Sequence, residues 1–167
     1  MAAKAIELFS KINNPNEMVL CLLFANCSQV GTKQALDFGR QIWSEMSLVN
    51  RRNKYTVNAA LNMFVTYGDV FNAENLFMTM KPDVINYGQM MKCYNHQKMP
   101  MKTMNLYKKM KDEGLQGDPI TFILLADACA QIGMKSYCRS IVSQIPQNVL
   151  ADVRLQTSLI HMWVRSV

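Results

Sequence analysis

The side chains that could catalyse a reaction or bind a metal are few in this sequence and widely spaced. Neither His96 nor His161 belongs to a set of closely spaced histidines, cysteines and carboxylates of the kind that binds zinc. The five cysteines form no C-x-x-C pair, and the chain has neither a G-x-S-x-G nucleophile motif nor a phosphate-binding glycine loop. We therefore expect a protein without catalytic activity, metal or cofactor.

Basic residues form two short clusters. The first contains Arg51, Arg52 and Lys54, and the second contains Lys108, Lys109 and Lys111. A solvated helix face is the ordinary interpretation of both clusters. Phosphate contact is the alternative, and it is more credible for the first cluster than for the second, because block boundaries border the expected groove. The formal net charge of +6 and the pI of about 9.1 mildly favour a polyanionic partner.

Composition predicts a folded helical chain. The chain has 167 residues, of which 50% are hydrophobic and only 18% charged, so it can bury a core and is not disordered. The 14 methionines are interpreted as core filling rather than as a binding groove. The longest apolar run, 19–25, is too short to span a bilayer, and residues 1–12 resemble neither a secretory signal nor an organellar presequence.

An internal repeat organises the whole sequence. Two columns of residues recur with identical steps: Cys27, Phe64, Tyr94 and Cys129, and then Gly31, Gly68, Lys98 and Gly133. A third column, Asn53, Asp83, Asp118 and Asp152, closes successive blocks. The blocks are 17–53, 54–83, 84–118 and 119–152, flanked by half repeats at 1–16 and 153–167. Repeats of this length predict a stack of similar helical units.

Each block has the apolar period of two helices. Tyr87, Met90, Met91 and Tyr94 fall on one face of a first helix. Pro100 suits the first turn of a second helix, and Gly68 and Gly133 suit the end of a first helix. Met80 and Met110 share a column that we expect to pack against the next pair. The sequence thus predicts an all-α, right-handed α-solenoid of stacked antiparallel helix pairs, forming a single domain over residues 1–167.

The repeats resemble those of the pentatricopeptide repeat family rather than the tetratricopeptide type, whose expected tryptophan register Trp43 and Trp163 do not match. Block 84–118, with NLYKKMKDEGLQGD, is similar to the ordinary repeat of that family. Block 54–83, with NAALNMFVTYGDVFNAENLFMTMKPD, resembles the short variant. Blocks 17–53 and 119–152 resemble the long variant through FANCSQVG, ALDFGRQIW and LADACAQIG. Thr32–Gln34 depart from the pattern and are expected to lengthen the second helix or its turn. The order resembles the mixed long, short and ordinary subclass.

This resemblance implies how the repeats would read RNA. In the family each repeat contacts about one base, which is chosen by the fifth residue and the last residue of the repeat. The fifth residues here are Cys21, Asn58, Gly88, Ile123 and Thr157. The last residues are Asn16, which closes the partial first block, and Asn53, Asp83, Asp118 and Asp152. Asn58 with Asp83 resembles the uracil-favouring combination, whereas Gly88 provides no reading side chain. The alternative for each aspartate is an ordinary helix cap.

The resemblance also implies a function and a location. The expected function is sequence-selective binding of single-stranded RNA in organellar editing, processing or translation. The location would be the mitochondrion, or alternatively the plastid. The alternative is a helical scaffold that docks protein subunits of a larger ribonucleoprotein. A protein partner or self-association is expected through terminal helices whose apolar faces are left uncovered: Ile6, Phe9 and Ile12 at one end, and Leu159, Ile160, Met162 and Trp163 at the other.

Overall fold

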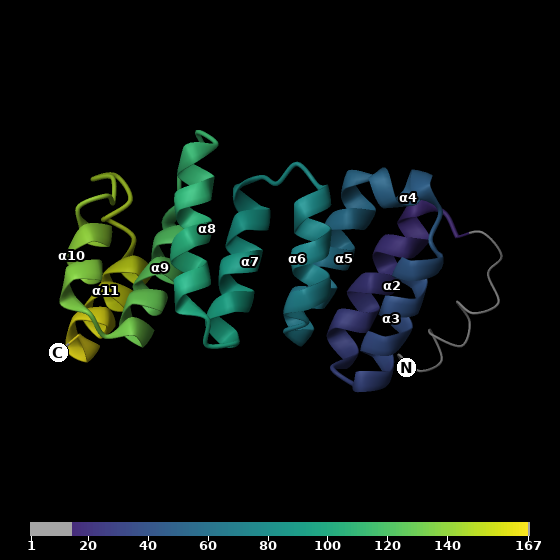
Figure 1. Cartoon of the computed structure of the whole chain (residues 1–167), viewed down its shortest axis with the longest axis horizontal. Coiled ribbons are helices and arrows are strands. Elements are labelled where there is room, and N and C mark those ends of the chain that lie inside the picture. The colour runs from purple at the N-terminus through teal and green to yellow at the C-terminus, as the bar shows by residue number, and fades with distance from the viewer. Residues whose placement is uncertain (1–14, 167) are drawn as a thin grey trace. The chain divides into compact units, whose positions relative to one another are not determined.

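The computed structural model describes residues 15–166, and every regular element in this part of the chain is a helix (Figure 1). This confirms the predicted all-α fold. The helices are α2 (Glu17–Val30), α3 (Lys33–Glu45), α4 (Leu48–Arg52), α5 (Lys54–Tyr67), α6 (Val70–Thr79), α7 (Val84–His96), α8 (Pro100–Asp112), α9 (Pro119–Ile132), α10 (Lys135–Val142) and α11 (Val153–Arg165). Residues 4–12, predicted to form half a repeat with Ile6, Phe9 and Ile12, lie outside the described residues.

The helices form two compact units, Met1–Lys81 and Pro82–Val167. In the first unit, α2 packs against α5, and α3 and α6 each pack against the helix that precedes them in their pair. In the second unit, α7 packs against α9 and α9 against α11, while α8 and α10 cover them. Within each unit, therefore, the first helices of successive pairs lie side by side, as expected of an α-solenoid.

The ends of the first helices explain one repeated column. Gly31, Gly68 and Gly133 follow α2, α5 and α9 with φ between 67° and 73°, in the left-handed region that glycine adopts without cost. Lys98 occupies the same place after α7 with φ 57°, which costs a non-glycine residue about 1 kcal/mol. The backbone N–H of Met99 donates to the carbonyl of Tyr94 across this turn at 2.8 Å.

The core of the second unit contains a polar network. Tyr87, Met90 and Met91 are completely buried. The Thr103 hydroxyl of α8 donates to Asn95 Oδ1 of α7 at 2.7 Å, and Asn95 Nδ2 donates to the Leu124 carbonyl of α9 at 2.8 Å. Because both side chains are buried and their polar atoms are paired, this network holds three helices in one arrangement.

Most of the cysteines belong to the core. Cys27, Cys93, Cys129 and Cys138 are buried, Cys21 is half-buried, and none of the five forms a disulfide. Burial raises the pKa of the Cys27 thiol to about 11 and that of the Cys129 thiol to about 12. Thiols with such pKa values are protonated at neutral pH and react poorly as nucleophiles.

Two details differ from the prediction. Residues 48–52 form an additional short helix, α4, in the block that contains Thr32–Gln34. Met162 is buried rather than exposed, because α11 packs against α9 and turns Leu155 and Met162 toward it. Ile160 and Trp163 remain exposed, at 66% and 39%. In the described range, the helices are too short or too polar to cross a bilayer.

Candidate nucleic-acid interface

The residues that close the blocks cap the first helices. Asn53, Asp83, Asp118 and Asp152 are the N-caps of α5, α7, α9 and α11, and their side chains accept hydrogen bonds from backbone N–H groups of the first turn. The distance from Asp118 Oδ1 to the Thr121 backbone nitrogen, for example, is 2.7 Å. Capping therefore fixes the orientation of the side chains to which the resemblance assigns base reading. Helix capping and base reading would use the same side chain, so the observed capping does not argue against base reading.

The fifth residues lie one turn further along the same helices. Cys21, Asn58, Gly88 and Ile123 are half-buried, and Thr157 is exposed. Within the second unit, Gly88 lies on α7 and Asp118 caps the adjacent helix α9, and Ile123 and Asp152 have the same relation on α9 and α11. Neighbouring first helices in each unit thus present one fifth residue and one cap at the same end of the stack.

The candidate pairs differ in what they offer a base. Asn53 donates its side-chain amide to Glu17 while its oxygen caps α5, so both of its polar groups are engaged. Asp152 Oδ2 accepts from the Arg154 guanidinium at 2.9 Å, and this hydrogen bond holds the pKa of the Asp152 carboxyl below its usual value. Asp118 caps α9 through Oδ1, so its Oδ2 takes no part in the cap. A side chain at Gly88 would meet no atom within 4 Å of its Cβ.

A second repeated set was missed by the sequence analysis. Met18, Tyr55, Ile85 and Ile120 are each the second residue of a first helix, and their exposed fractions are 70%, 71%, 70% and 51%. Each lies three residues before a fifth residue, and therefore on the same helix face. Exposed apolar side chains at such regular places provide surfaces for the faces of bases. The signal in the sequence was an apolar residue two positions after four of the caps, Asn16, Asn53, Asp83 and Asp118, whereas Arg154 follows Asp152.

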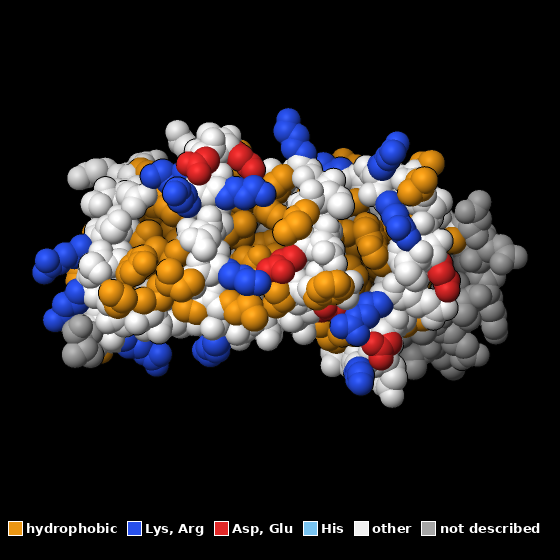
Figure 2. Space-filling model, in the orientation of Figure 1, with side chains coloured by type: hydrophobic (Ala, Val, Ile, Leu, Met, Phe, Trp, Pro, Cys, Tyr) orange, Lys and Arg blue, Asp and Glu red, His pale blue; other side chains and the backbone are white. Residues whose placement is uncertain are grey.

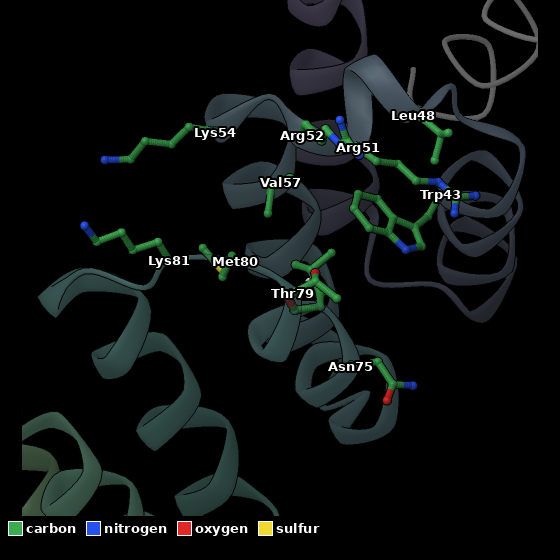
Figure 3. A pocket seen from close by; sticks show the side chains of 11 residues that line it. Trp43, Leu48, Arg51, Arg52, Lys54, Val57, Asn75, Thr79, Met80 and Lys81 are labelled. Atoms are coloured by element: carbon green, nitrogen blue, oxygen red, sulfur yellow. Dashed lines mark hydrogen bonds between the residues drawn. The ribbon is translucent and has the colours of Figure 1, made fainter. Parts of the chain in front are cut away.

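The first basic cluster lines a groove in the first unit. The groove has a volume of about 630 Å³ and is lined by Arg51, Arg52 and Lys54, together with Lys81 and residues of α3 and α6 (Figure 3). The second predicted cluster is different, because Lys109 forms an ion pair with Glu113 at 3.9 Å and Lys111 donates to Gln144 at 2.9 Å. In Figure 2 the other lysine and arginine side chains are scattered over the visible surface.

Metal binding finds no support in the part of the chain that the structure describes. No group of three or more histidine, cysteine, aspartate or glutamate side chains comes together there in a way that could hold an ion. His96 and His161 are both exposed. Two other features stand out, the regularly spaced side chains of the first helices and the groove lined by basic residues, whose positive charge favours an anionic ligand.

The sequence of this chain is similar to those of known repeat proteins. A chloroplastic pentatricopeptide repeat-containing protein of Arabidopsis thaliana is 25% identical over 122 residues, covering 72% of this chain and 14% of the relative. A second such protein from the same plant, described as putative, is 25% identical over 165 residues, covering 93% and 23%. A third is 27% identical over 146 residues, covering 84% and 26%. The chain is similar to pentatricopeptide repeat proteins.

The similarity extends along most of the chain but only part of each relative. The chain spans between 14% and 26% of the length of these three relatives. No protein-family model matches the chain. The likeness therefore supports repeats of the pentatricopeptide type, and the activity, partners and location of a whole protein are matters of proposal.

Proposed function

We propose that the chain is a pentatricopeptide repeat array of the mixed long, short and ordinary subclass, and that it binds single-stranded RNA at about one base per repeat. Its role would be in organellar RNA editing, processing or translation, in the mitochondrion or the plastid, with no catalytic centre of its own. One observation carries the proposal most strongly. First helices begin with a capping asparagine or aspartate, and the second residue of four of them is exposed and apolar.

In this arrangement, different residues contact the face and the edge of each base. The exposed second residue contacts the base face, where dispersion and desolvation provide sequence-independent affinity. The fifth residue forms a hydrogen bond with the base edge. The capping carboxylate at the start of the neighbouring helix accepts a second hydrogen bond from that edge or holds the edge in position. From the resemblance in sequence, Asn58 and the residue that closes its repeat, Asp83, are proposed to favour uracil. Repeats with Cys21 or Ile123 at the fifth position are proposed to bind a base without choosing it.

Replacing Gly88 with asparagine should create a second uracil-reading repeat. The Cβ meets no atom within 4 Å, and Asp118 already provides the closing carboxylate. We expect affinity for an RNA with uridine at the matching nucleotide to rise by about 1 kcal/mol, because one base-edge contact is gained. Fluorescence anisotropy with labelled RNAs measures this, and Gly88→Ala controls for the gain in helix propensity. Equal affinities of the two variants for every base would count against this assignment.

A second candidate function is docking of a protein, which the end of the second unit favours. Ile160, Trp163 and Val164 of α11 are exposed at 66%, 39% and 77%, and contiguous apolar surface of this kind commonly marks a contact site. We propose that this face binds a second copy of the chain or another helical protein. The repeats with Cys21 and Ile123 at the fifth position are poorly suited to choosing a base, which agrees with a scaffold role for part of the array.

The chain should therefore self-associate through α11. Light scattering of the wild type is expected to show a mass that increases with concentration. Ile160→Glu/Trp163→Glu is expected to remain monomeric, because two charges would have to be desolvated in the contact. Met162 is unsuitable for this test, since its burial means that a charge there would unfold the helix. A monomeric wild type at every concentration would rule out self-association.

A further inference from the structure

The additional helix α4 creates a groove that base reading does not use. The groove lies within the first unit, over α3, α4, the start of α5 and the end of α6. Its volume of about 630 Å³ is in the range of sites for small organic ligands. None of the fifth or closing residues lines it, so it is a separate feature from the candidate base-reading positions.

The charged side chains that line the groove are all positive. Its lining includes four cationic side chains, Arg51, Arg52, Lys54 and Lys81, and no aspartate or glutamate. Lys54 and Lys81 extend in the same direction, from the start of α5 and from the residues after α6, on the side of the groove opposite Arg51 and Trp43 (Figure 3). Cations gathered at a concave surface raise the local potential and attract an anionic ligand.

Arg51 is held in place before any ligand arrives. Its guanidinium lies 5.8 Å from the centre of the Trp43 ring and donates to the Ser44 carbonyl at 2.5 Å. Arg51 Nε is buried and has no hydrogen-bond partner among the described residues. A phosphate oxygen is the acceptor that a guanidinium binds best.

The remaining lining is apolar and fits a base beside the phosphate. Trp43, Leu48, Val57, Leu76 and Met80 line the groove together with the cations. Leu48 is 71% exposed, and Met80 is half-buried, so both can still bury surface against a ligand. A simple inorganic anion would leave this apolar surface in water, whereas a nucleotide would cover it.

We propose that this groove binds a short run of nucleotides of the single-stranded RNA, with one phosphate on Arg51 beside Trp43, a second phosphate on Lys54 and Lys81, and a base against Leu48. The proposal rests on the proposed function, since it assumes an RNA ligand, and adds a contact outside the base-reading positions. It gives α4 a role, because Leu48, Arg51 and Arg52 all come from that helix.

Tryptophan fluorescence tests the proposal directly. The chain has two tryptophans, so in Trp163→Phe the emission reports on Trp43 alone. Oligouridylate is expected to change this emission saturably. In the same background, Lys54→Gln/Lys81→Gln should weaken the affinity by about tenfold or more, because two phosphate contacts are lost. Arg51→Gln should do the same, with circular dichroism to check its folding. Lys108→Gln/Lys109→Gln removes equal charge from α8 and is expected to have a smaller effect.

Anisotropy of labelled oligouridylate, measured in parallel, separates the two proposals. RNA that binds with unchanged Trp43 emission, and equally well to the Lys54/Lys81 and Lys108/Lys109 variants, would overturn the groove and leave the proposed function intact. Absence of any RNA binding would overturn both. A Trp43 response to polyglutamate equal to the response to oligouridylate would also overturn the groove proposal, since it would indicate a site for acidic peptides.

Discussion

Replacing Met110 with alanine is expected to lower the free energy of unfolding by about 2–5 kcal/mol, the usual cost of truncating a large buried side chain. Met110 is completely buried on α8, the helix that packs against both α7 and α9 in the second unit. The cost has two parts, which are lost burial of the side chain and the cavity that remains. Urea unfolding followed by circular dichroism measures the change.

Met101 provides a matched control on the same helix. Its side chain is 47% exposed, so Met101→Ala should change the free energy of unfolding by no more than about 0.5 kcal/mol. Met80 should give an intermediate value, because it is only half-buried at the end of α6. A loss below about 1 kcal/mol for Met110→Ala would mean that the core of the second unit is packed differently.

The second large effect is expected at Asn58, where alanine should weaken RNA binding by about 1–3 kcal/mol, as for loss of other base-edge contacts. Asn58 is half-buried on α5 at the fifth position of its repeat. Because one side chain reads one base, the preference should be relaxed at a single nucleotide. Anisotropy with a set of RNAs that differ at one position at a time measures both effects.

Asn62 is the matched control for Asn58. It is also an asparagine of α5, one turn further along, and it is exposed. Asn62→Ala should leave both the affinity and the base preference unchanged. If Asn58→Ala weakens binding equally to every RNA sequence, the residue acts through folding of α5, and the reading role assigned to it is wrong.

The sequence predicted those features that depend on local backbone chemistry. The column of Gly31, Gly68, Lys98 and Gly133 marks residues that all adopt positive φ after a first helix, although one of them is a lysine. Pro100 begins α8 as expected. Such positions can be recognised in a sequence because the constraint on the backbone conformation acts within a few residues and does not depend on packing with distant parts of the chain.

Some features set by tertiary packing were not predicted. Met80 and Met110 share a column, yet only Met110 is buried, since α6 ends before Met80 in extended backbone. Met162 was expected on the open face and instead faces α9. Helix α4 was missed because five residues carry no clear period. The exposed apolar second residues were overlooked for a related reason, since an apolar residue in a helix is ordinarily assigned to the core.

The central claim, that this repeat array binds RNA and chooses bases, is tested most directly by one titration. The affinity of the unmodified chain is measured for oligouridylate and oligoadenylate of equal length, at a low and a high salt concentration. We expect binding that weakens as salt increases, because phosphate contacts release counterions, together with a preference for uridine from Asn58 and Asp83. No binding to either RNA at low salt would contradict the account and favour the protein scaffold.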